Sequence, residues 1–188
     1  MYKILVVDDE SIEREGISFL IEKYKFPLEV AQATNGKTAL EYMRTHPIDI
    51  LLTDVKMPQM DGLELARHTF EKYPDVRILV FSAYGEFEFA KKAMAAQAVS
   101  YLLKPIEVDE FQRVMTQIIA QCDELAEKKK DEQQRGEEYR QQLLFRLVTG
   151  TGLGKAHITE EWFSGQMLCL LHVQTENDYF ATNEDAFC

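Results

Sequence analysis

Short apolar runs rich in branched side chains alternate with longer helix-forming segments over the first 108 residues of the chain. This alternation constrains the fold most, because it is typical of βα units that build a parallel sheet. Several runs are apolar at nearly every position, as expected for strands buried on both faces. The runs that predict strands are Lys3–Val7, Glu29–Ala33, Ile48–Thr53, Arg77–Phe81 and Ser100–Leu103. We therefore expect an α/β fold with a doubly wound, five-stranded parallel sheet.

Helical periodicity fills the segments between these runs and continues after the last one. The four shorter predicted helices are Ser11–Tyr24, Lys37–Thr45, Gly62–Lys72 and Glu86–Ala96. After Pro105 the alternation stops, and residues 109–149 predict one extended helix. Heptad spacing places Met115, Ile118, Cys122, Leu125, Tyr139 and Leu143 on one seam. The seam suits either a coiled-coil linker between two chains or a monomeric helix packed on the sheet.

The last segment, residues 150–188, differs in composition from the rest. Its glycine-rich start reads GTGLGK, which invites a phosphate-loop interpretation. The spacing of that motif fails, because Thr149 stands where its first glycine is needed and Ala156 follows Lys155 in place of serine or threonine. We expect a loop and an incomplete fragment of a further region, too short for a stable core of its own.

Charge and composition exclude several classes of protein. A formal charge of -11 repels nucleic-acid phosphates, so we do not expect this chain to bind DNA by itself. No apolar run approaches the roughly 20 residues that span a membrane, and the first residues lead straight into a strand. The three cysteines have neither metal-ligand spacing nor an even number. These features predict a cytoplasmic protein without zinc or disulfides.

Polar side chains follow four of the predicted strands. Asp8 and Asp9 come after KILVV, Asp54 after ILLT, Ser82 after LVF and Lys104 after YLL. The carboxyl ends of parallel strands lie on one edge of the sheet, where ligands bind at the point of strand-order reversal. Taken singly, each residue has an ordinary explanation, such as a helix cap for Asp8-Asp9 or a solvated Lys104. Together they predict one pocket.

This set of residues predicts phosphoryl chemistry. Clustered carboxylates repel one another, so they need a cation or must take up protons. Mg²⁺ is the hard divalent ion that suits oxygen ligands and would resolve this conflict. Asp54 is placed to attack a phosphoryl donor and form an acyl phosphate. Lys104 and the Ser82 hydroxyl would then contact the transferred oxygens.

The blocks VVDDE, LLTDVKMPQMDG, VFSAYGE and YLLKP resemble the four signature blocks of the bacterial response-regulator receiver domain, in order and at suitable spacing. The resemblance covers residues 1–121 and implies a flavodoxin-like receiver fold. It implies that Asp8, Asp9, Asp54 and the backbone carbonyl of Lys56 bind the metal. It also implies that Asp54 is the phosphoacceptor, with Ser82 and Lys104 on the phosphoryl group, and that the Lys104–Pro105 bond is cis.

The resemblance also implies a switch. Tyr101 matches the aromatic residue that rotates when the phosphoryl group draws Ser82 inward, although its ordinary explanation is a half-buried strand tyrosine. Tyr84, Phe87 and Phe89 make the neighbouring face aromatic, and at least one of them is expected to be available to a partner.

The stretch SAYGEFEFA, the long helix and QQLLFRLVTG are similar to receivers that precede an AraC-type DNA-binding domain. The resemblance implies a response regulator that takes its phosphoryl group from a sensor histidine kinase. It would act as a switch rather than an enzyme, although it would assist its own phosphorylation and dephosphorylation. We expect a homodimer through the long helix or the switch face, and DNA binding only through a domain beyond this chain.

Two alternatives remain. A free-standing receiver could act only through protein partners, but the long helix argues for a connection to an output module. A phosphatase with an aspartyl nucleophile would use a similar pocket. Its nucleophile would follow the first strand in a DxD pattern, whereas this chain has adjacent Asp8 and Asp9.

Overall fold

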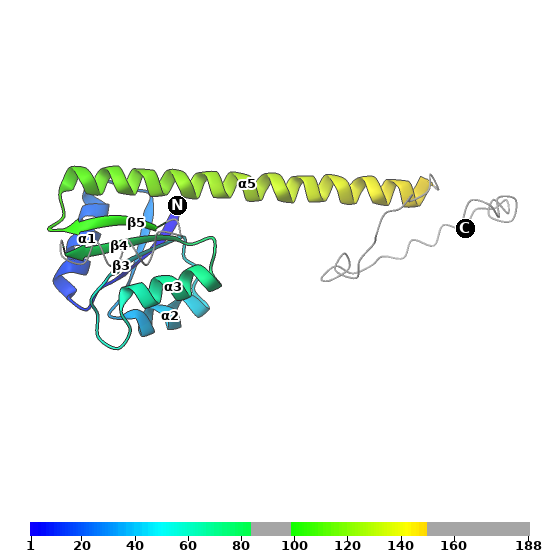
Figure 1. Cartoon of the computed structure of the whole chain (residues 1–188). Helices are drawn as coiled ribbons and strands as arrows, with labels where there is room; N and C mark the ends of the chain where they lie inside the picture. The colour runs from blue at the N-terminus through cyan, green and yellow to red at the C-terminus, as the bar shows by residue number, and fades with distance from the viewer. Residues whose placement is uncertain (84–98, 150–188) are drawn as a thin grey trace, which may run out of the picture. The chain divides into compact units, whose positions relative to one another are not determined.

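The computed structural model of the chain describes residues 1–83 and 99–149 (Figure 1). They fall into two units, one ending at Lys128 and the other beginning at Lys129. The described elements in chain order are β1 (Tyr2–Val7), α1 (Ser11–Lys23), β2 (Leu28–Ala33), α2 (Gly36–Thr45), β3 (Ile50–Asp54), α3 (Gly62–Lys72), β4 (Arg77–Ala83), β5 (Val99–Lys104) and α5 (Val108–Thr149).

The five strands form one parallel sheet in the order β2-β1-β3-β4-β5. Strand order reverses between β1 and β3, which lie side by side although β2 separates them in sequence. The central strands β1 and β3 are buried almost throughout, which explains their unbroken apolar character. The predicted fold class is confirmed.

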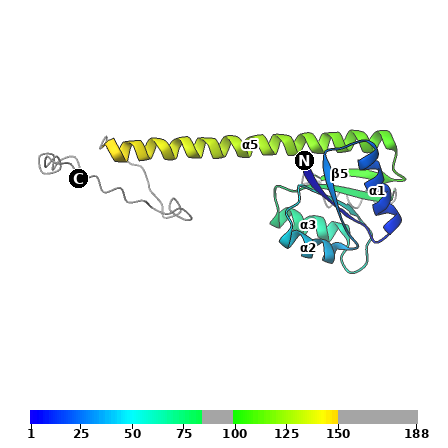
Figure 2. The same cartoon turned by 180° about the vertical axis from the view of Figure 1, so that it is seen from behind.

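Helices cover both faces of the sheet, with α2 and α3 on one face and α1 and α5 on the other (Figures 1 and 2). Alternate strand residues therefore feed two cores. One core joins Leu51 and Val80 to Ala39 of α2 and Leu65 of α3. The other core joins Ile4, Ile50 and Phe81 to residues of α1 and α5. The sheet is thus fixed on both sides, and its strand ends are held in place for a site.

The first turns of α5 belong to this second core. Phe111 and Met115 are fully buried, and Ile118 and Cys122 are almost so. Met115, Ile118 and Cys122 form the first part of the predicted heptad seam, and in the structure these side chains pack in the core between α5 and the sheet. In the unit that begins at Lys129, Leu143 is buried, whereas Tyr139, Leu144 and Phe145 are exposed.

Most predicted elements agree with the structure to within one or two residues. The third strand begins at Ile50 rather than Ile48. Just before it, the Lys3 N–H donates to the Asp49 carboxylate at 2.7 Å rather than to a backbone carbonyl, and the Asp49 N–H donates to the Lys3 carbonyl at 2.9 Å. The long helix is confirmed at Val108–Thr149. The predicted helix Glu86–Ala96 and residues 150–188 lie outside the described residues. The limits 1–121 for the receiver domain and 109–149 for the linker stay predictions.

Two further expectations concern backbone geometry and membranes. The Lys104–Pro105 peptide bond is cis, as the family resemblance implied. Within residues 1–83 and 99–149, no helix is long and apolar enough to cross a membrane.

We predict that Phe111→Ala destabilises the domain, because a fully buried ring is removed from between α5 and the sheet. The expected loss is about 3–5 kcal/mol. Urea unfolding followed by circular dichroism would measure it. Arg113→Ala on the same helix is the control, since its side chain is exposed with only a 3.6 Å contact to Glu110. Its effect should stay within about 0.5 kcal/mol. Equal losses for the two variants would contradict the packing described here.

Candidate functional site

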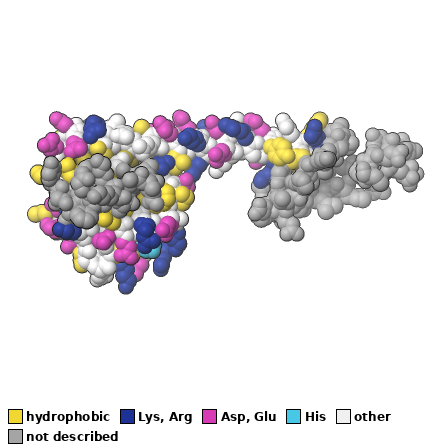
Figure 3. Space-filling model, viewed as in Figure 1, with side chains coloured by type: hydrophobic (Ala, Val, Ile, Leu, Met, Phe, Trp, Pro, Cys, Tyr) yellow, Lys and Arg dark blue, Asp and Glu magenta, His cyan; other side chains and the backbone are white. Residues whose placement is uncertain are grey.

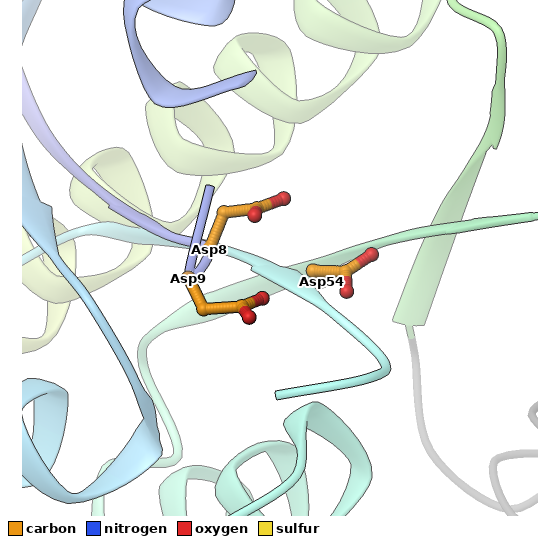
Figure 4. Close-up of side chains that lie close together, drawn as sticks. All are labelled: Asp8, Asp9 and Asp54. Atoms are coloured by element: carbon orange, nitrogen blue, oxygen red, sulfur yellow. The ribbon is translucent and has the colours of Figure 1, made fainter. Parts of the chain in front are cut away.

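Three aspartates meet at the carboxyl ends of the adjacent strands β1 and β3. Asp8 and Asp9 follow the last residue of β1, and Asp54 is the last residue of β3. One carboxylate oxygen from each lies within 4.8 Å of the other two. Figure 4 shows the three side chains directed toward a common space. The site therefore lies where strand order reverses, as expected for a doubly wound sheet.

The three carboxylates differ in burial. Asp8 is 1% exposed and Asp54 is 7% exposed, whereas Asp9 faces solvent. Backbone donors hold the two buried groups. The Glu10 N–H donates to Asp8 Oδ1 at 2.8 Å, and the Lys56 N–H donates to Asp54 Oδ2 at 3.0 Å. Access from solvent is therefore on the Asp9 side.

Lys104 is the positive charge of the site. It is the last residue of β5, and its Nζ lies 3.1 Å from Asp8 Oδ2 and 3.0 Å from Asp54 Oδ1. The same Nζ lies 4.4 Å from the centre of the Phe81 ring, so an aromatic face also contacts the ammonium. One lysine thus joins two carboxylates from different strands.

Burial and charge move the pKa values of this pair. Burial raises the pKa of Asp54, and the Asp8 carboxylate adds to this effect while Lys104 opposes it, so the pKa stays above its usual value. Burial alone would lower the pKa of Lys104, but its bonds to Asp54 and Asp8 outweigh that effect and raise it. Lys104 is therefore a cation at neutral pH.

The donor set fits a hard divalent cation. Three carboxyl groups face a single ammonium in the described part of the pocket, so the acidic groups outnumber the cation and a divalent ion would balance them. All three ligands are oxygens, the donor type that Mg²⁺ and Ca²⁺ prefer. Among the described residues, these three aspartates are the only acidic, histidine or cysteine cluster with metal-ligand geometry.

Ser82 and Tyr101 lie on the adjacent strands β4 and β5. Ser82 is fully buried near the end of β4. Val80 pairs with Tyr101 and Ser82 pairs with Leu103, so Ser82 and Tyr101 are diagonal neighbours on one face of the sheet. Tyr101 packs partly buried against the core on that face, and burial raises the pKa of its hydroxyl to about 12. The predicted switch residues are therefore neighbours, whereas Tyr84, Phe87 and Phe89 lie outside the described residues.

The loop from β3 to α3 carries Lys56. Its N–H contacts Asp54, whereas the predicted metal contact through its carbonyl stays a prediction. Gln59 at the loop tip has a φ of 70°, and the Met60 N–H donates to the Pro58 carbonyl at 2.9 Å, which makes a tight turn. A Cβ on Gly36 would lie 2.6 Å from Met60 Cγ, so the Met60 side chain packs closely on the start of α2.

Gly62 closes this loop at its base, a role that sequence reasoning did not find. Its N–H donates to the Val55 carbonyl at 2.9 Å. A Cβ at this position would lie 1.8 Å from the Asp54 carbonyl oxygen and 2.9 Å from Thr53 Oγ1. The only available signal is the Asp61-Gly62 pair, which reads as an ordinary turn. Only glycine lets α3 begin so close to the Asp54 backbone.

The fold is a doubly wound domain with one charged pocket where strand order reverses. The pocket is formed by the acidic residues after β1, the aspartate that ends β3 and the lysine that ends β5. The chain belongs to the response regulator receiver domain family, whose model matches residues 4–116. The family resemblance in the signature blocks is therefore confirmed.

Curated proteins similar to this chain include a transcriptional regulatory protein and a response regulator. The chain is 41% identical over 122 residues to the transcriptional regulatory protein YesN of Bacillus subtilis, covering 64% of this chain and 33% of that protein. It is 33% identical over 120 residues to the response regulator GacA of Pseudomonas aeruginosa, covering 64% of this chain and 56% of that protein. The matched part is thus one third of the first relative's length and just over one half of the second's.

Solved structures similar to this chain also come from response regulators. A two component transcriptional regulator AraC from Clostridium phytofermentans superposes with a TM-score of 0.61 at 34% identity, covering 66% of this chain and 97% of that one. The REC domain of AraT, a response regulator from Geobacillus stearothermophilus, superposes with a TM-score of 0.60 at 37% identity. That match covers 68% of this chain and 98% of the other.

We predict opposite effects from one substitution at two glycines. Gly62→Ala should destabilise the protein by about 1–3 kcal/mol, because the new methyl group displaces the Asp54 backbone. Gly16→Ala in α1 should stabilise it by about 0.5–1 kcal/mol, since nothing lies within 4 Å of the added carbon. Urea midpoints of the two variants test this prediction. A neutral Gly62→Ala would contradict the close approach.

Proposed function

We propose that this chain is the phosphorylation-dependent receiver of a transcriptional response regulator, with Asp54 as the phosphoacceptor. One observation carries the proposal. The buried Asp54 carboxylate ends a central strand, with the Lys104 ammonium at 3.0 Å and two further carboxylates beside it. Among the described residues, this is the arrangement that combines a nucleophile, a fixed cation and metal ligands.

The reaction forms one bond and breaks one. A carboxylate oxygen of Asp54 attacks the phosphorus of the donor, and the bond from phosphorus to the donor's leaving atom breaks. Lys104 neutralises charge on the transferred oxygens, and the Ser82 hydroxyl donates a hydrogen bond to one of them. We propose a sensor histidine kinase as the donor. The domain is a switch rather than an enzyme with a separate substrate, although the same groups assist loss of the phosphoryl group.

Asp8, Asp9, Asp54 and the backbone carbonyl of Lys56 would hold the metal, which we propose is Mg²⁺. A bound divalent cation would supply charge neutralisation for the aspartates and the incoming phosphoryl oxygens. The small size and hard character of Mg²⁺ suit a site that keeps water positions next to phosphate. Asp9 provides the side of the pocket that faces solvent.

Phosphorylation is read out through Ser82 and Tyr101. Once the phosphoryl group draws the Ser82 side chain toward it, space opens on the shared face of β4 and β5, and the Tyr101 ring moves into it. Their diagonal placement on neighbouring strands supports this coupling. The populations of two conformations would shift, as two-state switches require.

The output lies in a longer parent protein. The matched part of this chain corresponds to 33% of YesN, a transcriptional regulatory protein. We propose that DNA binding belongs to a domain beyond this chain, as in AraC-type regulators, and that the parent acts in the cytoplasm. The chain's own charge of -11 does not favour contact with nucleic acid.

We also propose homodimer formation through the switch face or α5. Because Met115, Ile118 and Cys122 already pack against the sheet, pairing of α5 falls to its later turns, where Tyr139 of the predicted seam is exposed. Charged side chains of both signs line α5 (Figure 3), which suits a helix with alternating salt bridges more than a continuous apolar seam.

We predict that Asp54→Asn abolishes Mg²⁺-dependent labelling by a small acyl-phosphate donor and leaves the fold intact. Intact mass spectrometry of the full chain detects the added phosphoryl group, and circular dichroism checks the fold. Asp61→Asn is the matched control, because that carboxylate caps α3 and should leave labelling unchanged. Labelling that persists in Asp54→Asn, or that maps to Asp8, would refute the assignment.

We predict that the full chain self-associates, and that Tyr139→Glu weakens this association about tenfold by placing a charge on the predicted seam. Gln141→Glu adds the same charge at an exposed position off that seam and should have little effect. Sedimentation equilibrium of both variants measures the dissociation constants. A strict monomer with and without the acyl-phosphate donor would rule the dimer out.

A further inference from the structure

The junction between β1 and α1 leaves the Asp9 carboxylate without support of its own. Among the residues that the structure describes, none forms a hydrogen bond or ion pair with this side chain, although it points toward Asp54 (Figure 4). Glu10, which caps α1, makes no side-chain hydrogen bond to the helix. The direction of the Asp9 side chain therefore depends on how the Asp8–Asp9 backbone is held.

Arg14 holds that backbone. Its Nη1 donates to the main-chain oxygen of Asp8 at 2.6 Å. This oxygen belongs to the peptide group that joins Asp8 to Asp9, so the contact fixes the rotation of that peptide plane. Since the plane sets the direction in which Asp9 leaves the chain, the contact acts on the carboxylate that has no hydrogen bond of its own to any described residue. The Asp8 carboxylate oxygens stay with Glu10 and Lys104.

A closed ring of hydrogen bonds keeps the Arg14 side chain in place. Arg14 Nε donates to Gln32 Oε1 at 3.3 Å, and Gln32 Nε2 donates to Ser18 Oγ at 3.0 Å. Ser18 Oγ donates back to the Arg14 carbonyl at 2.8 Å. The ring spans the first turns of α1 and the edge strand β2. Such support leaves the guanidinium few alternative positions.

We propose that Arg14 is a positioning residue of the metal pocket, which sets the Asp9 carboxylate by holding the Asp8–Asp9 peptide. This inference rests on the proposed metal site. A guanidinium suits the role because it presents donors in a rigid fork, one for the peptide oxygen and one for Gln32. A lysine has one compact ammonium and cannot reach both partners with the same geometry.

Mg²⁺ titration of the full chain by calorimetry tests the proposal. Arg14→Gln should raise the dissociation constant for Mg²⁺ about tenfold or more, the range found when a partner of a metal ligand is removed. Arg67→Gln is the matched control, since Arg67 is an exposed helical arginine whose ion pair within the described part of the chain is with Glu71 at 3.1 Å. It should bind Mg²⁺ as the unmodified chain does.

Two further variants distinguish the position of the Arg14 donors from the positive charge of Arg14 and from an effect on folding. Arg14→Lys keeps the positive charge and should still weaken Mg²⁺ binding, whereas Gln32→Ala should weaken it less, because Arg14 loses one support. If Arg14→Gln does not fold, these two variants carry the test. Normal affinity in both would overturn the proposal.

The outcomes also distinguish this inference from the proposed function. Absence of Mg²⁺ binding in the unmodified chain, or normal binding in Asp9→Asn, would remove the metal site itself. Loss of binding in Asp9→Asn together with normal binding in Arg14→Gln would overturn the Arg14 inference alone.

Discussion

The structure depends on how three like charges are held together at one edge of a sheet. Carboxylates within 4.8 Å of one another repel strongly in a partly buried pocket. The Lys104 ammonium offsets part of this repulsion by contacting Asp8 and Asp54 together, and backbone N–H groups of Glu10 and Lys56 offset more. The side of the pocket that faces solvent, at Asp9, keeps an excess of negative charge. The divalent cation proposed for this site would balance that charge.

The parallel sheet makes this arrangement possible. Because β1 and β3 are buried on both faces by helices, their ends cannot spread apart to relieve the repulsion. Lys104 enters from β5, two strands away from Asp54, and the Phe81 ring beneath it limits where the ammonium can go. Charges that would separate in a flexible loop are thus fixed at short range. The cost of holding them is met by the apolar packing of the two cores.

Much of this arrangement follows from the sequence. The strand periodicity and the polar residues at strand ends predicted both the sheet and the meeting of Asp8, Asp9, Asp54 and Lys104, since parallel strands bring their carboxyl ends to one edge. Contacts set by side-chain reach were not predictable in this way. The Arg14–Gln32–Ser18 ring depends on the packing angle between α1 and β2. The heptad pattern in α5 cannot by itself tell a partner helix from the sheet that Met115 and Ile118 in fact contact.

A hydrogen bond closes the base of the loop that carries Lys56. The Gly62 N–H donates to the Val55 carbonyl, and the absence of a Cβ at Gly62 lets α3 begin next to Asp54. Residues 56–61 therefore form a loop whose two ends lie close together. Changes at the tip, where Gln59 turns the chain, should therefore have little effect on the position of Asp54. Substitutions in residues 56–61 can therefore change the surface beside the Asp54 carboxylate while the carboxylate itself stays in place.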